Sequence, residues 1–294
     1  MDLKRITYAP SFKLGYQRMG MSLSAPIPFR LYVDGDDTYT SDSVQLKLPD
    51  VNLWIGEVGI DVRVTPAMVL YVNGAGNLLQ NLVLSLSGRS AAGVDESTWR
   101  THSLTWMELD GGIRYRLGSL FDAAAGVRWD HFDLTVRDPD IMTKVNVGAY
   151  RNVSLLTSDV LSGVWMPYVG GELRFKGLRA TLIGAPFAPV ILRVRTRLRA
   201  DILPAHDFLG ESAMTMKSTA MFAEARLEYE IHLAEKTMLK LWGKGGWLSA
   251  RGGGRLESGY GTTHSGLTVG IGSDRQLRFG RFTLGGGMAL NITF

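Results

Sequence analysis

Four arginines that alternate with uncharged residues are the side chains of this sequence with the clearest potential for chemistry. They are Arg193, Arg195, Arg197 and Arg199. On an extended strand these residues share one face and stand about 6.8 Å apart, because each residue advances the strand by about 3.4 Å. Guanidinium groups hold carboxylates and phosphates through paired hydrogen bonds, and a cationic row favours anions in a pore. The spacing therefore predicts an anion-binding wall along a lumen.

Acidic and basic residues alternate with apolar ones in three further segments, residues 54–64, 106–117 and 221–233. Their charged positions complete the predicted lumen set, which adds Glu57, Asp61, Arg63, Glu108, Asp110, Arg114, Glu224, Arg226, Glu228 and Glu230. Two interpretations of this set stay open. Either the charged side chains form a permeation surface, or the carboxylates neutralise the arginine row and fill the lumen with salt bridges.

The composition excludes several classes of protein. The chain has 294 residues, no cysteine and a formal net charge of +4 that is spread along its length. Without cysteine there is no disulfide scaffold and no thiolate metal site, and the scattered charge provides no basic face for a nucleic acid. No spacing predicts a zinc site. We therefore expect no metal, no cofactor and no nucleic-acid partner.

The positions of the apolar residues indicate strands that cross a membrane. No stretch has the roughly 18 uncharged apolar residues that a spanning helix needs. Residues 281–294 carry Phe, Leu, Gly, Met, Leu, Ile and Phe at their even positions, and such a strict period of two is typical of a strand. Arginine or lysine facing lipid at the midplane costs about 2–4 kcal/mol. We therefore expect charged faces to line a lumen and apolar faces to meet lipid.

The terminal segment, and the alternation over most of the chain, resemble the bacterial outer-membrane β-barrels. Phe294 at the end of an alternating strand looks like the signal that the barrel-assembly machinery of this class reads. The resemblance implies an all-β fold, a transmembrane antiparallel up-and-down β-barrel in the bacterial outer membrane, with outer-membrane lipid and the assembly machinery as partners. No apolar signal segment follows Met1, so we expect a mature exported chain. No linker divides the sequence, and we expect residues 1–294 to form one domain.

The number of strands follows less directly from the sequence. Counting hairpins gives eleven strands, whereas a bacterial single-chain barrel has an even number. Dividing residues 178–200 at Pro186 and Pro189, which cannot donate ladder hydrogen bonds, gives twelve strands, and this is the number we predict. Ten strands result if the N-terminal region is a plug or an external hairpin, and fourteen if residues 29–33 or 81–87 form strands.

These features predict a porin-like channel for the diffusion or uptake of small solutes, with anions favoured by the arginine row. One alternative is a plugged structural or adhesive barrel that acts through its outer loops. Another is an outer-membrane hydrolase, but Ser103 and Ser265 directly follow His102 and His264, and adjacent strand residues point to opposite faces. Because neither hydroxyl can meet its base, we name no catalytic residue and expect a protein that is not an enzyme.

Overall fold

A computed structural model describes the backbone of most of the chain. The described residues are 7–25, 29–33, 36–81, 84–90, 93–138, 152–202, 206–234, 237–262 and 268–292. The regular structure in these ranges is entirely β-strand. No helix among these residues is long and apolar enough to cross a bilayer.

Ten long strands form a closed antiparallel barrel. Each pairs with the next along the chain, and β1 closes the ring by pairing with both β3 and β12. The ten strands are β1 (Thr7–Ala25), β3 (Asp36–Arg63), β4 (Met68–Asn81), β6 (Gly93–Arg116), β7 (Phe121–Asp138), β8 (Asn152–Phe175), β9 (Leu178–Ile202), β10 (His206–Ala234), β11 (Thr237–Thr262) and β12 (Thr268–Ile292). Two short strands, β2 (Phe29–Val33) and β5 (Leu84–Ser90), extend the wall beside β3.

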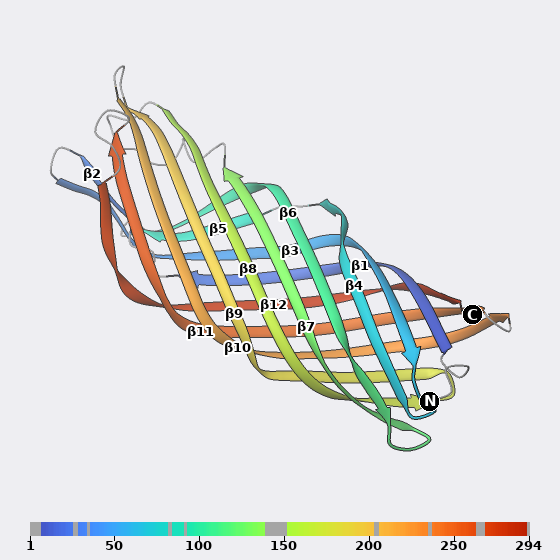
Figure 1. The fold of residues 1–294 in the computed structure, drawn as a ribbon. Coiled ribbons are helices and arrows are strands. Elements are labelled where there is room, and N and C mark those ends of the chain that lie inside the picture. Colours follow the sequence, from blue (N-terminus) through green and yellow to red (C-terminus); the bar gives the residue numbers. More distant parts are fainter. Residues whose placement is uncertain are drawn as a thin grey trace.

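The two ends of the barrel differ (Figure 1). At one end, which we call the turn end, short turns at residues 64–67, 117–120 and 176–177 join neighbouring strands. β1 begins and β12 ends there, with Ser11 facing Asn291. Lys176 and Gly177 have positive φ angles of 46° and 83°, as a two-residue type I′ hairpin requires. The opposite end, where β2 and β5 lie, we call the loop end.

The all-β antiparallel barrel is confirmed, but the wall has ten strands and not the twelve predicted. β9 continues through the two prolines as a single strand. β12 begins at Thr268, so residues 281–292 continue a strand that the hairpin count divides in two. Ten strands were one of the alternatives, although the N-terminal segment lies in the wall and is not a plug. Phe294 lies outside the described residues, and the single domain over residues 1–294 stays a prediction.

A bulge in β9 reverses the two faces of this strand. Pro186 and Phe187 together oppose the single residue Met221 of β10, because the register moves from Ala188 facing Ala220 to Ala185 facing Phe222. A bulge adds one residue to one strand and so exchanges its inward and outward positions. Leu182, on the turn-end side of the bulge, is 63% exposed, whereas Leu192, on the loop-end side, is 1% exposed.

The outer face of the barrel carries a band of apolar side chains. On β10, Met221, Leu227, Tyr229 and Leu233 point outward and are each at least half exposed. They span twelve positions of the strand, a height of about 30 Å at ~3.4 Å per residue and a tilt of ~40°. The hydrocarbon core of a bilayer is about 30 Å thick. The band therefore matches a membrane, and β10 continues beyond it toward the loop end.

Closure of the barrel requires a close approach of β1 and β12 at Gly287. A Cβ atom at this position would lie 2.1 Å from the Leu14 carbonyl oxygen and 2.5 Å from the Gly15 Cα. Overpacking costs about 1–3 kcal/mol, so we expect Gly287→Ala to lower the free energy of unfolding by about that amount in urea titrations in detergent micelles. Gly20→Ala is the control, because nothing lies within 4 Å of a Cβ atom there. Equal urea concentrations at the midpoint of unfolding for the two variants would contradict this register of β1 and β12.

Candidate functional site in the barrel interior

Arg128 of β7 is the centre of a buried cluster of charges inside the barrel. Its Nη1 lies 2.8 Å from a carboxylate oxygen of Glu224, its Nη2 lies 3.1 Å from Asp110, and its Nε lies 3.7 Å from Glu108. These partners come from β10 and β6, so one guanidinium joins three strands across the bore. The Arg128 side chain is only 2% exposed. A planar guanidinium with several fixed donors suits such a buried site.

Two tyrosines extend this cluster on the side of β4 and β8. The Tyr168 hydroxyl donates a hydrogen bond of 2.6 Å to Asp110, and it also contacts the Tyr71 hydroxyl. The Arg128 guanidinium lies 5.8 Å from the centre of the Tyr168 ring and 5.3 Å from that of Phe222. The guanidinium therefore has carboxylates at its edge and aromatic rings at its faces.

Further ion pairs lie on both sides of Arg128 along the bore. Toward the loop end, Arg281 pairs with both oxygens of Asp130, at 2.6 and 2.7 Å. Toward the turn end, Lys13 lies 2.7 Å from Glu57 and 3.5 Å from Glu228. The remaining pairs include Arg114 with Asp61 at 2.5 Å, Arg179 with Glu230 at 3.0 Å, Lys240 with Glu230 at 2.9 Å and Arg174 with Glu172 at 2.7 Å. We call all these paired interior residues the ionic layer.

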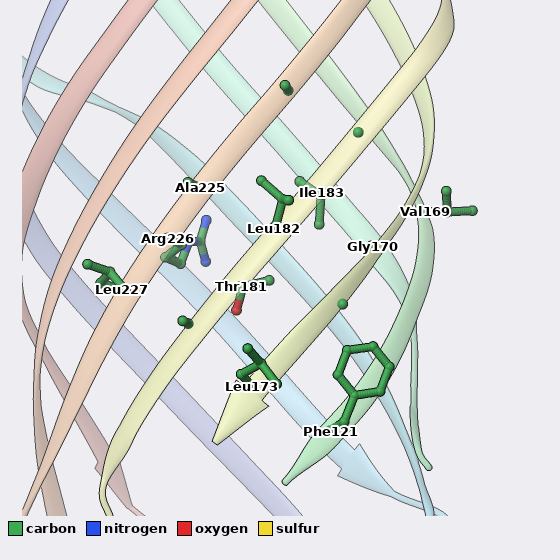
Figure 2. Close-up of a pocket in the computed structure, with 14 residues that line it drawn as sticks. Phe121, Val169, Gly170, Leu173, Thr181, Leu182, Ile183, Ala225, Arg226 and Leu227 are labelled. Atoms are coloured by element: carbon green, nitrogen blue, oxygen red, sulfur yellow. The ribbon is translucent and has the colours of Figure 1, made fainter. Parts of the chain in front are cut away.

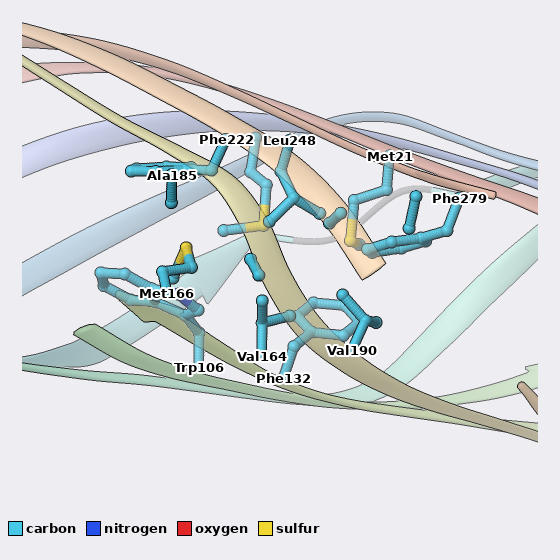
Figure 3. Packing of buried hydrophobic residues seen from close by; sticks show 14 of the residues in the cluster. Met21, Trp106, Phe132, Val164, Met166, Ala185, Val190, Phe222, Leu248 and Phe279 are labelled. Carbon is cyan, nitrogen blue, oxygen red and sulfur yellow. The ribbon is translucent and has the colours of Figure 1, made fainter. Parts of the chain in front are cut away.

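Apolar side chains fill the bore on the loop-end side of the ionic layer (Figure 3). They are inward-facing residues of nine strands and include Met19, Leu53, Leu104, Phe132, Leu134, Val164, Met166, Val190, Leu192, Met216, Phe222, Leu248 and Phe279, each at most 7% exposed. We call this set the apolar layer. On β7 the change occurs within two residues, from the buried Asp130 to the fully buried Phe132.

A small polar cavity lies in the ionic layer, with a volume of about 90 Å³. A cavity needs about 10–15 Å³ of such volume to hold one water molecule, so water fits in this one. Its lining includes Arg128, Asp110, Tyr168 and Glu224, at its boundary with the apolar layer. On the loop-end side of this cavity, the buried side chains of the apolar layer close the described part of the bore.

The structure places most of the predicted lumen residues inside the barrel. Glu57, Glu108, Asp110, Glu224 and Glu228 are buried there, and Asp61, Arg114, Arg226 and Glu230 form ion pairs with inward-facing partners. Arg63 lies at the turn end and is exposed. Sequence reasoning missed the partners that organise the site, above all Lys13, Arg128, Asp130, Glu172 and Arg281, although the alternation along residues 122–134 places Arg128 and Asp130 on one face.

The arginine row does not line the lumen at the two positions whose side chains are described. Arg193 and Arg195 are exposed, whereas their neighbour Leu192 is buried in the apolar layer. The bulge at Pro186 and Phe187 is the physical reason, because it turns the odd positions of β9 outward on its loop-end side. The side chains of Arg197 and Arg199 lie outside the described residues.

A hollow of about 610 Å³ lies on the outer face of β8, β9 and β10 (Figure 2). Its lining is mostly apolar or small, with Thr181 and Arg226 as its polar members. Val169, Leu173, Leu182 and Leu227 in it are each more than half exposed. These side chains belong to the outer apolar band. The hollow therefore opens on the outer face, and its residues Thr181, Ile183 and Arg226 also line the cavity inside the bore.

Comparison with known proteins identifies the fold. No protein-family model matches the chain, and no curated protein matches its sequence. Among solved structures, the outer-membrane protease OmpT of Escherichia coli aligns with a TM-score of 0.59 at 14% identity, over 98% of this chain and 97% of OmpT. The chain therefore has the closed antiparallel β-barrel fold of this outer-membrane protein. At this identity the likeness establishes the fold alone.

Two other outer-membrane barrels align over most of their length with lower scores. The translocator domain of the autotransporter NalP of Neisseria meningitidis has a TM-score of 0.40 at 12% identity, over 94% of this chain and 87% of that domain. A Pseudomonas aeruginosa FadL homologue has a TM-score of 0.37 at 7% identity, over 97% and 90%. Scores this low support no conclusion about function.

The likeness to OmpT corrects one expectation from the sequence. We expected a protein that is not an enzyme, but a solved barrel of the same shape is a protease, so this fold does not argue against enzymatic activity. Among the described residues, no group of three or more His, Asp or Glu side chains is placed to hold a metal ion.

Removing the Arg128 guanidinium tests the ionic layer. Arg128→Met leaves Glu224, Asp110 and Glu108 without their shared partner, and breaking a buried pair from one side costs about 3–5 kcal/mol. We expect this loss in urea unfolding of the refolded barrel. Arg116→Met is the control, because the Arg116 side chain is 43% exposed and its contact with Asp122 is 3.9 Å long. A change below about 1 kcal/mol for Arg128→Met would show that the carboxylates do not depend on it.

Proposed function

We propose that this barrel is an outer-membrane channel for small solutes, and that the apolar layer closes it in the present conformation. One observation carries the proposal: a cavity of about 90 Å³ lined by charged groups borders the buried apolar layer in the same bore. Apolar constrictions gate pores by dewetting, because ions do not enter a passage that excludes water. Separation of the apolar side chains would connect the cavity with the loop end.

The energetics of the ionic layer support a passage over a merely structural filling. Taking charges out of water is costly, and replacing buried ion pairs with apolar residues of similar volume is often neutral or stabilising. The apolar layer demonstrates that this barrel can be filled with apolar side chains. The retention of so many ion pairs around a cavity of about 90 Å³ therefore favours contact with water and solutes in an open state.

The composition of the cavity gives little support to a preference for anions. Its cationic lining residues are Lys13, Arg114, Arg128, Arg179, Arg226 and Lys240. Its anionic lining residues are Asp61, Asp110, Glu172, Glu224 and Glu228. With the two signs nearly balanced, and with Arg193 and Arg195 on the outer face, we propose small solutes of either charge as the permeating class.

A polar substitution in the apolar layer tests the gate. Phe132 is fully buried at the boundary with the ionic layer, and Phe132→Ser would let water enter the constriction. In planar lipid bilayers we expect rare openings from the wild-type barrel and at least a tenfold higher open probability from Phe132→Ser.

Phe187→Ser is the matched control, since Phe187 is on the same barrel but is 73% exposed on the outer face. We expect it to behave as the wild type in repeated insertions. If neither the wild type nor Phe132→Ser showed any conductance, with folding verified by circular dichroism, the result would contradict the proposed channel. Equal activation by the two variants would contradict a gate in the apolar layer.

A second candidate is a hydrolase that works at the loop end, where the strands extend beyond the apolar band. The protease OmpT, which has the same fold, is the observation that motivates this candidate. Incubating the refolded barrel with a peptide library and analysing the products by mass spectrometry tests it directly. Cleavage of peptides at defined residues would favour the hydrolase function, and recovery of all peptides intact would contradict it.

A further inference from the structure

Basic side chains project from the outer face of the barrel just beyond the apolar band, on its loop-end side. Arg193 and Arg195 lie on β9, Lys217 on β10, Arg251 on β11 and Arg278 on β12, and all five are exposed. Their neighbours in the same strands, such as Leu192, Ala250 and Phe279, are buried in the bore, so the five point away from it. With Arg18 of β1, which is also exposed, we call them the basic belt.

Among the side chains that the structure describes, the belt occupies one side of the barrel. The other outward side chains described at this level of β9 to β12 and β1 are small or polar and include Thr215, Thr219, Ser249 and Ser22. None of the described ones is acidic. On β3, β6, β7 and β8 the described outward residues at the same level are Asn52, Thr105, His131, Asp133, Thr135, Leu161 and Gly163, without a lysine or arginine. A general attraction to lipid would not need this asymmetry.

Two members of the belt lie directly beside each other. Arg251 of β11 and Arg278 of β12 are paired in the ladder and share the outward face. Directly opposed residues on neighbouring strands have Cβ atoms about 4.5–5.5 Å apart, and like charges there are destabilising. No described acidic side chain pairs with either of them, in contrast to the arginines of the ionic layer. An anion bound between the two guanidinium groups would remove this repulsion.

The height of the belt matches the headgroup region of a membrane. Arg193 is two residues beyond Ile191, and Arg251 is four residues beyond Trp247; both apolar residues are nearly half exposed. Two to four residues of a tilted strand correspond to about 5–10 Å in height. The headgroup region extends about 5–8 Å beyond the hydrocarbon core on each side. A ligand on the belt therefore has an anionic group at this height and hydrocarbon beside the apolar band.

We propose that the basic belt is a binding site for a phosphorylated glycolipid of the surrounding membrane. The guanidinium groups would hold its phosphates through paired hydrogen bonds, and the serine and threonine hydroxyls between them would contact its sugars. The Arg251 and Arg278 pair is the phosphate site. This site does not depend on whether the bore conducts.

Binding of a defined lipid to the full-length refolded barrel tests the proposal. The probe is lipid A, an acylated glucosamine disaccharide with two phosphates, titrated in detergent and followed by native mass spectrometry. Each basic residue near a membrane surface contributes about 1 kcal/mol, which is about a factor of five. We therefore expect Arg251→Ser with Arg278→Ser to weaken binding about thirtyfold, with unchanged circular dichroism and conductance.

The control variant carries Arg116→Ser and Lys176→Ser, two exposed basic residues at the turn end, and we expect it to bind as the wild type. Lipid A without phosphates should bind the wild type as weakly as the belt variant binds the intact lipid. Equal loss in the belt and control variants, or equal binding of the dephosphorylated lipid, would overturn the site. Equally tight binding of phosphatidylglycerol would overturn the assignment to a glycolipid.

Discussion

Backbone hydrogen bonding in hydrocarbon is the constraint on which the rest of this structure depends. A strand in a bilayer must pair on both sides, because no water is present to satisfy its amide and carbonyl groups. β1 meets this requirement by pairing with β3 and β12, which removes both edges of the sheet. Closure gives the wall an inside and an outside, and the period of two then assigns each residue to one of them. Every functional feature of the barrel follows from that assignment.

The sequence predicts these two faces wherever the alternation is unbroken. Glu224 and Glu228 of β10 were assigned to the interior because apolar residues separate them, and they lie there. The same rule fails for Arg193, because a single bulge at Pro186 and Phe187 exchanges the faces of β9. The two prolines indicate an irregularity in the sequence, but whether prolines end a strand or form a bulge in it depends on the neighbouring strands. This ambiguity explains one of the two extra strands in the predicted twelve, and the division of β12 into two strands explains the other.

The apolar layer could not be predicted from the period of the sequence. Val164, Trp165 and Met166 are consecutive apolar residues, of which Trp165 faces outward and the other two face the bore. Because this segment is apolar on both faces, its sequence shows no alternation. The charged faces of the other strands, moreover, predict a polar interior. For Arg128, in contrast, the alternation predicts that the side chain faces the bore. It does not predict the three carboxylate partners, because they lie on β6 and β10, at other places in the sequence.

Basic residues have different surroundings inside the barrel and on its outer face. Inside, where charges are desolvated, each described arginine and lysine of the ionic layer has a carboxylate partner, as burial of an ion requires. On the outer face of β9 to β12, the described cations share their level with hydroxyls and glycines, and no acidic residue is among the outward side chains that the structure describes there. The bulge in β9 thus moves Arg193 from the compartment in which it would have to be neutralised to the outer surface, where an external anion can reach it.

Accessibility of single spin labels along β9 tests the reversal of its faces most directly. Labels at Leu182→Cys, Leu192→Cys and Arg193→Cys in lipid vesicles would be compared by their collision rates with oxygen, which concentrates in lipid. Positions 182 and 192 have the same parity, but Leu182 is 63% exposed and Leu192 is 1% exposed. We predict high accessibility at 182, low accessibility at 192 and renewed accessibility at 193. Equal, high accessibility at 182 and 192 with a protected label at 193 would contradict the bulge, and with it the outward basic belt.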